Sequence, residues 1–143
     1  MSASGKLCLE MYATVCTDEH GTESSGNADW LGSIKVLTVC QPWASLIVAG
    51  IKDVENRSWR TDYRGRLGIH AGIHVDHDAL DAYGHLLDDD LPLEALIGSV
   101  TLVDCTKDSN KWSSPGPWHW ILADPEKLAR PRPMPGQSGL WEA

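Results

Sequence analysis

Three charged side chains with complementary chemistry lie close together in the run GIKDVENR, which extends from Gly50 to Arg57. Lys52 offers hydrogen-bond donors, or a nucleophile when its pKa is low, and Glu55 can accept hydrogen bonds or act as a general base. Arg57 offers a planar fork that suits a phosphate or a base edge. On an extended strand Glu55 and Arg57 share a face, and a turn at Gly50 would let Lys52 join them. The three side chains could then hold a polar ligand at the mouth of a cleft, where we expect Lys52 to be exposed.

The same spacing also fits a set of salt bridges on a solvated strand, because surface charge clusters are common and contribute little to stability. The residue types alone leave both interpretations open. The chain carries a net charge of −8, whereas residues 50–66 contain five Lys or Arg against three acids, a local charge of +2. The overall acidity argues against wrapping of a long polyanion by the whole surface. A basic cleft on an acidic body favours a small or single-stranded ligand.

The elements that position this run follow from hydrophobic periodicity and turn residues. Residues 1–32 are predicted to form an N-terminal extension, flexible because much of it is polar and rich in Ser, Thr and Gly, and residues 33–143 to form one domain. Pro42 is expected to open a helix that Gly50 ends, so that the first turn offers free N–H groups to an anion. The remaining elements are expected in this order: strands at 34–40, 53–59 and 66–71, a helix at 76–87 capped by Asp76, a strand at 95–106, a loop at 107–117 long enough to form a lid, a strand at 118–122, an extended edge at 128–135 and a closing segment at 139–141.

Composition argues against several classes of protein. The chain of 143 residues is long enough for one hydrophobic core, has no apolar run near 18 residues, and does not begin with a basic stretch followed by an apolar run. We therefore expect no membrane segment, no secretion, and a cytoplasmic or nuclear location. The four cysteines form no CxxC pair, and Cys40 and Cys105 are expected to be buried, reduced thiols. The spacing of His70, His74 and His77 resembles a metal site, but they fall on different predicted elements, so we predict no metal.

A series of short motifs follows in fixed order between residues 34 and 143. It comprises Gln41-Pro42-Trp43, Gly50-x-Lys52-x-x-Glu55-x-Arg57, Trp59, Tyr63-Arg64-Gly65, Ile69-His70-Ala71, Ile97-Gly98-Ser99-Val100, Val103-Asp104-Cys105, Trp118-x-Trp120 and Gly139-Leu140-Trp141. This series resembles the ASCH domain, the activating signal cointegrator homology family of PUA-like β-barrels. The resemblance implies an α/β (α+β) fold: a small PUA-like mixed β-barrel of about six strands with two or three helices. It also implies a cleft that binds RNA or another nucleic acid.

The predicted partner is single-stranded RNA or a nucleotide-like ligand, held by phosphate contacts at the helix start and by the charged triplet, with a Trp stacked on a base. The predicted ligand-binding residues are Gln41, Pro42, Trp43, Ser45, Lys52, Glu55, Arg57, Trp59, Tyr63, Arg64 and His70. His70 is included as a proton carrier or base-contacting group, although a lone His is more often a hydrogen-bonded core group. No cofactor is predicted, and we expect a monomer.

Some relatives in this family are enzymes, which makes a hydrolase an alternative function. Ribonucleases are among them, and so is a subgroup that cleaves acyl groups from modified cytidine and carries Thr where this chain has Glu55. The alternative is a ribonuclease or amidohydrolase acting on RNA or on a modified nucleoside, with Lys52 and Glu55 as its catalytic residues. Because relatives occur within transcription coactivators, a protein-interaction module is a second alternative. The sequence leaves open whether the chain is a binder or an enzyme.

Overall fold

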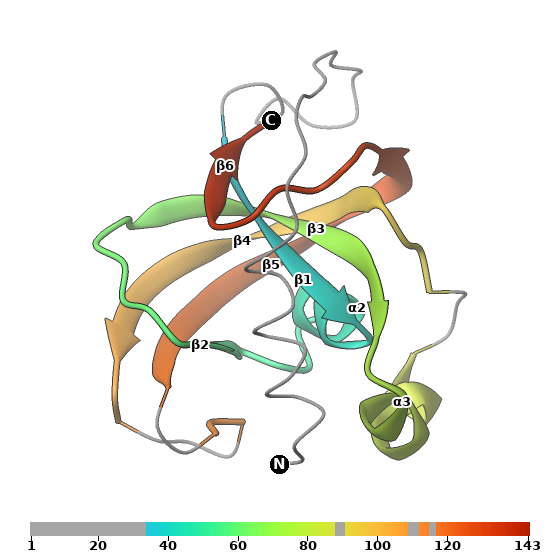
Figure 1. Ribbon diagram of the computed structural model, residues 1–143, viewed down its shortest axis with the longest axis horizontal. Coiled ribbons are helices and arrows are strands. Elements are labelled where there is room, and N and C mark those ends of the chain that lie inside the picture. Colours follow the sequence, from blue (N-terminus) through green and yellow to red (C-terminus); the bar gives the residue numbers. More distant parts are fainter. Residues whose placement is uncertain (1–33, 88–90, 109–111, 115–116) are drawn as a thin grey trace.

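The computed structural model describes residues 34–87, 91–108, 112–114 and 117–143, so the extension predicted for residues 1–32 lies outside the described residues. The elements, in chain order, are β1 (Lys35–Gln41), α2 (Trp43–Val48), β2 (Val54–Arg57), β3 (Gly65–Val75), α3 (His77–Tyr83), the 3-10 turn η2 (Gly84–Leu86), β4 (Ala95–Thr106), β5 (Trp118–Pro133) and β6 (Leu140–Glu142). Figure 1 shows the strands curving around a common core, with α2 against them and α3 at the periphery.

The six strands form one mixed sheet in the order β2-β5-β4-β3-β1-β6. The β1–β3 pair is parallel, and the other pairs are antiparallel. β2 and β6 are the two ends of this sheet, so the strands curve like a barrel that stays open between them. Six strands and two α-helices in the described residues form a small α+β fold, which confirms the predicted class.

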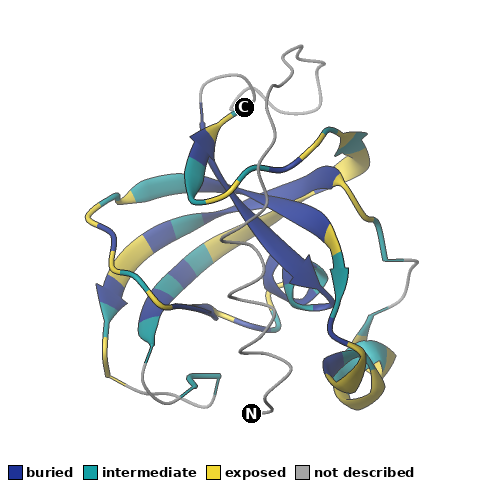
Figure 2. Ribbon diagram, viewed as in Figure 1, coloured by how far each residue is buried: buried dark blue, intermediate teal, exposed yellow. Residues whose placement is uncertain are grey.

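Aliphatic side chains fill the inside of the curved sheet because successive residues of a strand point to opposite faces. Figure 2 shows the buried residues along the central strands and on α2. The helix contributes Ala44, Ile47 and Val48, whose spacing by three and four residues places them on one face. Trp120, which is fully buried, is the largest side chain of this core. A smaller core lies against the C-terminal segment and consists of Ile34, Val36, Leu96, Leu128 and Trp141.

The predicted helix at 76–87 is confirmed in its first half. The Asp76 side chain caps α3 by accepting a hydrogen bond from the Ala79 N–H at 3.1 Å, as an N-cap aspartate does. From Gly84 the chain tightens into the 3-10 turn η2 instead of continuing as α-helix. The strand predicted at 95–106 coincides with β4, and the closing segment forms β6, which pairs with β1.

The strands predicted separately at 118–122 and 128–135 are one continuous strand, β5. The prolines at 131, 133 and 135 suggested a separate edge segment. β2 pairs with β5 only as far as Ile121, so the later part of β5 has a side without a strand partner, where a proline costs no ladder hydrogen bond. The prediction of two separate segments is therefore wrong, whereas the prediction that the later segment lies at an edge is confirmed.

Gly98 marks the expected close approach between β4 and β5. A Cβ atom at this position would lie 2.5 Å from the Glu126 carbonyl oxygen and 2.8 Å from Val48. The pairing then shifts: Gly98 faces Lys127, whereas Leu96 faces Arg132. Residues 128–131 of β5 are thus opposed by a single residue of β4, and they form a bulge at the edge of the sheet.

The two cysteines of the described region differ in state. Cys105 is buried and free, as predicted. Cys40 is also buried but is disulfide-bonded, so the prediction of a reduced thiol is wrong at that position. The cysteines therefore give no support to a reducing compartment. None of the helices in the described part of the chain is long and apolar enough to span a membrane.

Candidate functional site

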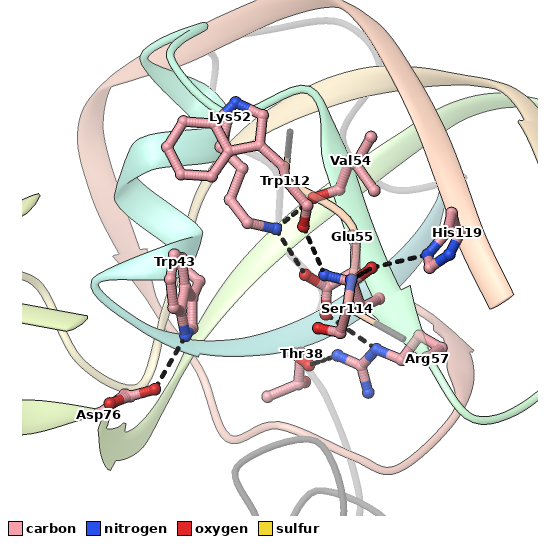
Figure 3. A network of polar contacts seen from close by, with 11 residues as sticks. Thr38, Trp43, Lys52, Val54, Glu55, Arg57, Asp76, Trp112, Ser114 and His119 are labelled. Atoms are coloured by element: carbon pink, nitrogen blue, oxygen red, sulfur yellow. Dashed lines mark hydrogen bonds and ion pairs between the residues drawn. The ribbon is translucent and has the colours of Figure 1, made fainter. Parts of the chain in front are cut away.

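The turn at Gly50 brings the three charged side chains together. Gly50 adopts φ +81°, and the chain then hydrogen-bonds back to α2 before β2 begins. The Lys52 ammonium donates to the Val54 carbonyl oxygen and lies 3.7 Å from one Glu55 carboxylate oxygen. The Arg57 guanidinium binds the other Glu55 oxygen at 3.0 Å. Figure 3 shows this arrangement, in which one carboxylate is shared by two cations. We call these three residues the charged triplet.

The charged triplet is buried, so the expectation that Lys52 is exposed at a cleft mouth is wrong. Lys52 is 4% exposed, and Glu55 and Arg57 are each 3% exposed. Buried charges persist only when they are paired and hydrogen-bonded, as these are. Burial lowers the pKa of Lys52, the neighbouring Glu55 opposes this shift, and the positive Arg57 reinforces it. A lysine in this environment holds its proton less firmly than one in water.

Arg57 also connects two strands that are distant in the sheet. Its guanidinium donates to the Thr38 carbonyl oxygen of β1 at 2.7 Å. β6 pairs with β1 only at Lys35–Leu37, so this carbonyl lies just past the end of that ladder. We call the gap between β2 and β1 the seam. The charged triplet lies at the seam, and Arg57 bridges it where no backbone ladder does.

Three aromatic rings follow one another from Lys52, and we call them the ring line. The Lys52 ammonium is 5.2 Å from the centroid of the Trp43 ring. Trp43 is 5.7 Å from Tyr83, and Tyr83 is 5.3 Å from Trp112, both pairs being tilted. The Trp43 indole N–H donates to Asp76 at 3.2 Å, which fixes the orientation of this ring. A cation over an indole and tilted ring pairs are both favourable geometries, and ring faces can stack nucleic-acid bases.

Asn56 holds the segment that carries Trp112. Its amide nitrogen donates to the Trp112 carbonyl oxygen at 2.9 Å, and its amide oxygen accepts from the Ser114 N–H at 3.2 Å. The same oxygen lies 2.8 Å from His119 Nδ1, which must then carry the proton and leave Nε2 as an acceptor. Burial lowers the pKa of His119, and the positive charge of Lys52 lowers it further. Neutral His119 therefore helps to fix Trp112 through Asn56.

The sequence model of the ASCH domain matches residues 37–131, which run from within β1 to near the end of β5. This chain belongs to the ASCH family. Activating signal cointegrator 1 is 34% identical in its Homo sapiens form and 30% identical in its Mus musculus form, each over 125 residues. These alignments cover 74% of this chain but only 22% of each relative, so the chain spans about a fifth of their length.

Solved structures of an ASCH protein from Zymomonas mobilis share the fold. One crystal structure has a TM-score of 0.52 and 19% sequence identity, covering 78% of this chain and 87% of that chain. A mutant form of that protein also has a TM-score of 0.52, with 17% identity and coverage of 78% and 90%. At this level of identity, the likeness concerns the fold alone.

The motif residues of the turn that follows β2 support local structure of the ASCH domain. Trp59 packs edge-on against Trp120 with 4.9 Å between ring centroids, which places it against the core. The Tyr63 hydroxyl donates to the Arg66 carbonyl oxygen at 2.5 Å and holds the start of β3. Arg64 donates to two carbonyl oxygens of the turn and pairs with an exposed aspartate of β4 at 3.5 Å. Of these predicted ligand residues, Arg64 is the exposed one.

The start of α2 is built differently from the anion site predicted there. Gln41 is completely buried, and its amide oxygen accepts the Ser45 N–H at 3.0 Å, so this first-turn donor is already used. The Gln41 amide nitrogen donates to the Ser45 hydroxyl and to the Pro92 carbonyl oxygen, both at 2.9 Å. Ser45 lies two residues beyond Trp43, which places it on nearly the opposite side of the helix. Gln41 and Ser45, and Pro42 at the N-cap, therefore do not join the charged triplet.

His70 belongs to a separate buried network beneath the C-terminal segment. Its Nε2 lies 2.7 Å from the Met134 carbonyl oxygen and therefore carries the proton. The Trp141 indole donates to the Thr38 hydroxyl at 3.1 Å, and that hydroxyl lies 3.3 Å from His70 Nδ1, to which it can donate. Burial lowers the pKa of His70, and its bond to Met134 opposes the shift. The structure does not place His70 with Lys52.

Acidification is expected to destabilise the protein through His70. Its pKa is lower in the folded state than the unfolded value of about 6.5, so the unfolded state binds more protons below that pH. The stabilisation is complete above about pH 6.5 and is lost as the pH falls towards the folded pKa, with a limiting slope of about 1.4 kcal/mol per pH unit. Urea unfolding of wild type and His70→Gln should show the steeper loss in wild type, with His119→Gln as the control for the second shifted histidine. Parallel pH profiles for wild type and His70→Gln would contradict the assignment.

We call the charged triplet, the three rings and the residues that hold them the seam site. Four of its residues were absent from the predicted set of ligand-binding residues: Asn56, Tyr83, Trp112 and His119. Asn56 lies inside the GxKxxExR spacing and His119 lies between two tryptophans, which are the signals that could have drawn attention to them. Tyr83 and Trp112 come from elements remote in sequence. In the part of the chain that the structure describes, no three metal-ligating side chains gather, and the absence of a metal stays a prediction.

Proposed function

We propose that this ASCH domain binds single-stranded RNA, or a nucleotide-like ligand, at the seam between β2 and β1. The observation that carries the proposal is the Lys52 ammonium against Trp43, at one end of the line of rings that Tyr83 and Trp112 continue. Aromatic rings stack on bases of any sequence, and a neighbouring cation attracts phosphate. Membership of the ASCH family supports the proposal, because the family resemblance implies nucleic-acid binding.

The proposed ligand meets the rings and the rim before it meets the charged triplet. Lys52 is 4% exposed, so we place the charged triplet at the floor of the site, where it contributes positive potential and holds Trp43. We assign the rim of the proposed site to two exposed arginines on the turn after β2: Arg60, which pairs with Asp62 at 2.8 Å, and Arg64. Exposed ion pairs are worth little, so a phosphate can replace the carboxylate partner of either arginine.

Binding of a short single-stranded RNA is expected to weaken steeply as salt rises. Each phosphate neutralised on a single strand contributes about −0.7 to the slope of log K against log salt, so two rim contacts give about −1.4. Fluorescence anisotropy of a labelled RNA of about eight nucleotides, titrated at several salt concentrations, measures this slope. Arg60→Gln and Arg64→Gln should each reduce it by about 0.7.

The control for these arginines is Lys35→Gln. Lys35 is an exposed cation paired with Glu142 at 3.1 Å, at the β1–β6 end of the sheet. It has a similar side-chain exposure to Arg64 but lies outside the seam site, so its loss should leave the slope unchanged. RNA binding that does not depend on salt, or that depends on Lys35 as much as on Arg64, would contradict the proposal.

A hydrolase acting on RNA or a modified nucleoside is the second candidate, and one observation favours it. Burial lowers the pKa of Lys52, whose amine lies 3.7 Å from the Glu55 carboxylate. An amine of reduced basicity beside a carboxylate provides the residue types that general-base or nucleophilic chemistry requires. Incubation with N4-acetylcytidine followed by chromatography tests it. Cytidine formed by wild type, but not by folded Lys52→Met, would make the domain an enzyme.

A further inference from the structure

A cavity of about 550 Å³ lies on the side of α2 that carries Ser45. Its walls come from the end of α2, the 3-10 turn η2 with the residue that follows it, residues 91–92, Ile97 of β4 and the bulge of β5. They are apolar except for the Ser45 hydroxyl and the Lys127 side chain, together with backbone groups. The volume falls in the range of small-molecule pockets, about 300–1,000 Å³. None of the lining residues belongs to the charged triplet or to the ring line.

Gln41 lies behind the cavity and holds two of its lining residues together. The Gln41 amide is completely buried and binds both Ser45 and Pro92, each of which lines the cavity. A buried amide that lost these partners would leave unsatisfied groups, so the two walls are held at a set separation. The Ser45 hydroxyl oxygen accepts from Gln41, which leaves the hydroxyl proton free to be donated elsewhere.

The opposite walls leave apolar surface uncovered. Residues 128–131 of β5 bulge away from β4, and Ala129 of this bulge lines the cavity and is exposed. Leu86 of η2, another lining residue, is 44% exposed. A concave site lined mostly by apolar side chains is typical of small-molecule pockets. The cavity thus has apolar walls, and its lining includes one hydroxyl-bearing residue, Ser45, and one cationic residue, Lys127.

We propose that this cavity binds a small molecule with an apolar body and one carboxylate group. The hydrocarbon part lies between α2, η2 and the β5 bulge. The carboxylate accepts a hydrogen bond from Ser45 and pairs with the Lys127 ammonium, the one charged side chain in the lining. The proposal explains why Gln41 is buried and hydrogen-bonded to Ser45 on the side of α2 that faces away from the charged triplet. It is independent of RNA binding, because the two sites share no residue.

Octanoate is the probe, and octanol, which lacks the charge, is its matched analogue. Both are titrated into the full ¹⁵N-labelled chain, and amide shifts are followed by NMR. Octanoate should shift signals of residues around the cavity and bind more tightly than octanol. Lys127→Gln should weaken octanoate about tenfold and leave octanol unchanged. Lys107→Gln removes an exposed lysine that follows the end of β4, lies against Trp118 and does not line the cavity, so it should change neither.

Ala49→Trp is the blocking variant. Ala49 lines the cavity, is exposed, and caps α2 at φ −81°, so a tryptophan there fills the mouth without entering the core. Octanoate binding should be lost in this variant, while its RNA binding stays that of wild type. Three results would overturn the proposal: absence of shifts around the cavity, undiminished octanoate binding by folded Ala49→Trp, or tighter binding of octanol than of octanoate. Loss of RNA binding alone would instead count against the seam site.

Discussion

Replacing Glu55 with alanine is expected to lower the free energy of unfolding by about 3–5 kcal/mol, because it leaves buried cations without their shared carboxylate. Lys52 and Arg57 are 4% and 3% exposed, and Glu55 contacts both. Water cannot take the place of the carboxylate unless the seam opens. Chemical denaturation, followed by tryptophan fluorescence and circular dichroism, measures the loss.

The exposed pair of Arg66 and Glu126 provides the matched control. Its atoms are 3.3 Å apart, but its side chains are 40% and 52% exposed, so Glu126→Ala should cost no more than about 1 kcal/mol. Glu55→Gln removes the charge while keeping the shape, and it should fall between the two. A cost below about 1 kcal/mol for Glu55→Ala would contradict the description of the triplet as a buried ion cluster.

Strands whose pattern is set locally could be predicted from the sequence, whereas strand continuity could not. The apolar, β-branched run from Ala95 to Thr106 was sufficient to predict both ends of β4, and Gly98 within it indicated the close approach of another backbone. The prolines of β5 suggested a break because they cannot donate to a ladder. Whether a proline interrupts a strand depends on which neighbour it faces. That neighbour is β2, whose short length ends the pairing at Ile121.

The spacing placed Glu55 and Arg57 on one face of a strand and allowed Lys52 to join them if the chain turned at Gly50, because a glycine turn and strand alternation are local properties. Their burial was not predictable in the same way. It depends on Thr38 of β1 and Trp43 of α2, which reach the seam only after the sheet has curved. Solvent exposure depends on the packing of the whole fold. The same run of charged residues is compatible with an exposed strand and with a buried one.

Gln41 and His70 show a second limit of sequence reasoning. A glutamine or histidine within a motif can contact a ligand or satisfy buried backbone groups, and both roles need the same donors and acceptors. Here Gln41 binds the carbonyl of Pro92, and His70 binds that of Met134, 51 and 64 residues further along the chain. Partners so distant leave no local signal. The same holds for Tyr83 and Trp112, which approach Trp43 only through the fold.

Trp112→Ala is expected to weaken the binding of short single-stranded RNA by roughly five- to 150-fold, because stacking of a base on an aromatic ring is worth about 1–3 kcal/mol. Trp112 is half-buried and lies outside both hydrophobic cores, so the fold should tolerate its loss. Asn56 binds the backbone carbonyl of Trp112, a contact that alanine retains. The loss of affinity therefore reports on the ring itself. Fluorescence anisotropy at fixed low salt measures it.

Trp112→Phe is the control that separates stacking from loop structure. Phenylalanine keeps a ring beside Tyr83, so affinity should stay close to that of wild type, while alanine should lose most of the stacking. Equal affinities for wild type, Phe and Ala variants would remove Trp112 from the site. Equal losses in Phe and Ala, with unchanged melting temperatures, would mean that the indole N–H rather than the ring face binds the ligand. The stacking account requires the order wild type, then Phe, then Ala, because a base needs a ring face and the backbone contacts of this segment are the same in all three.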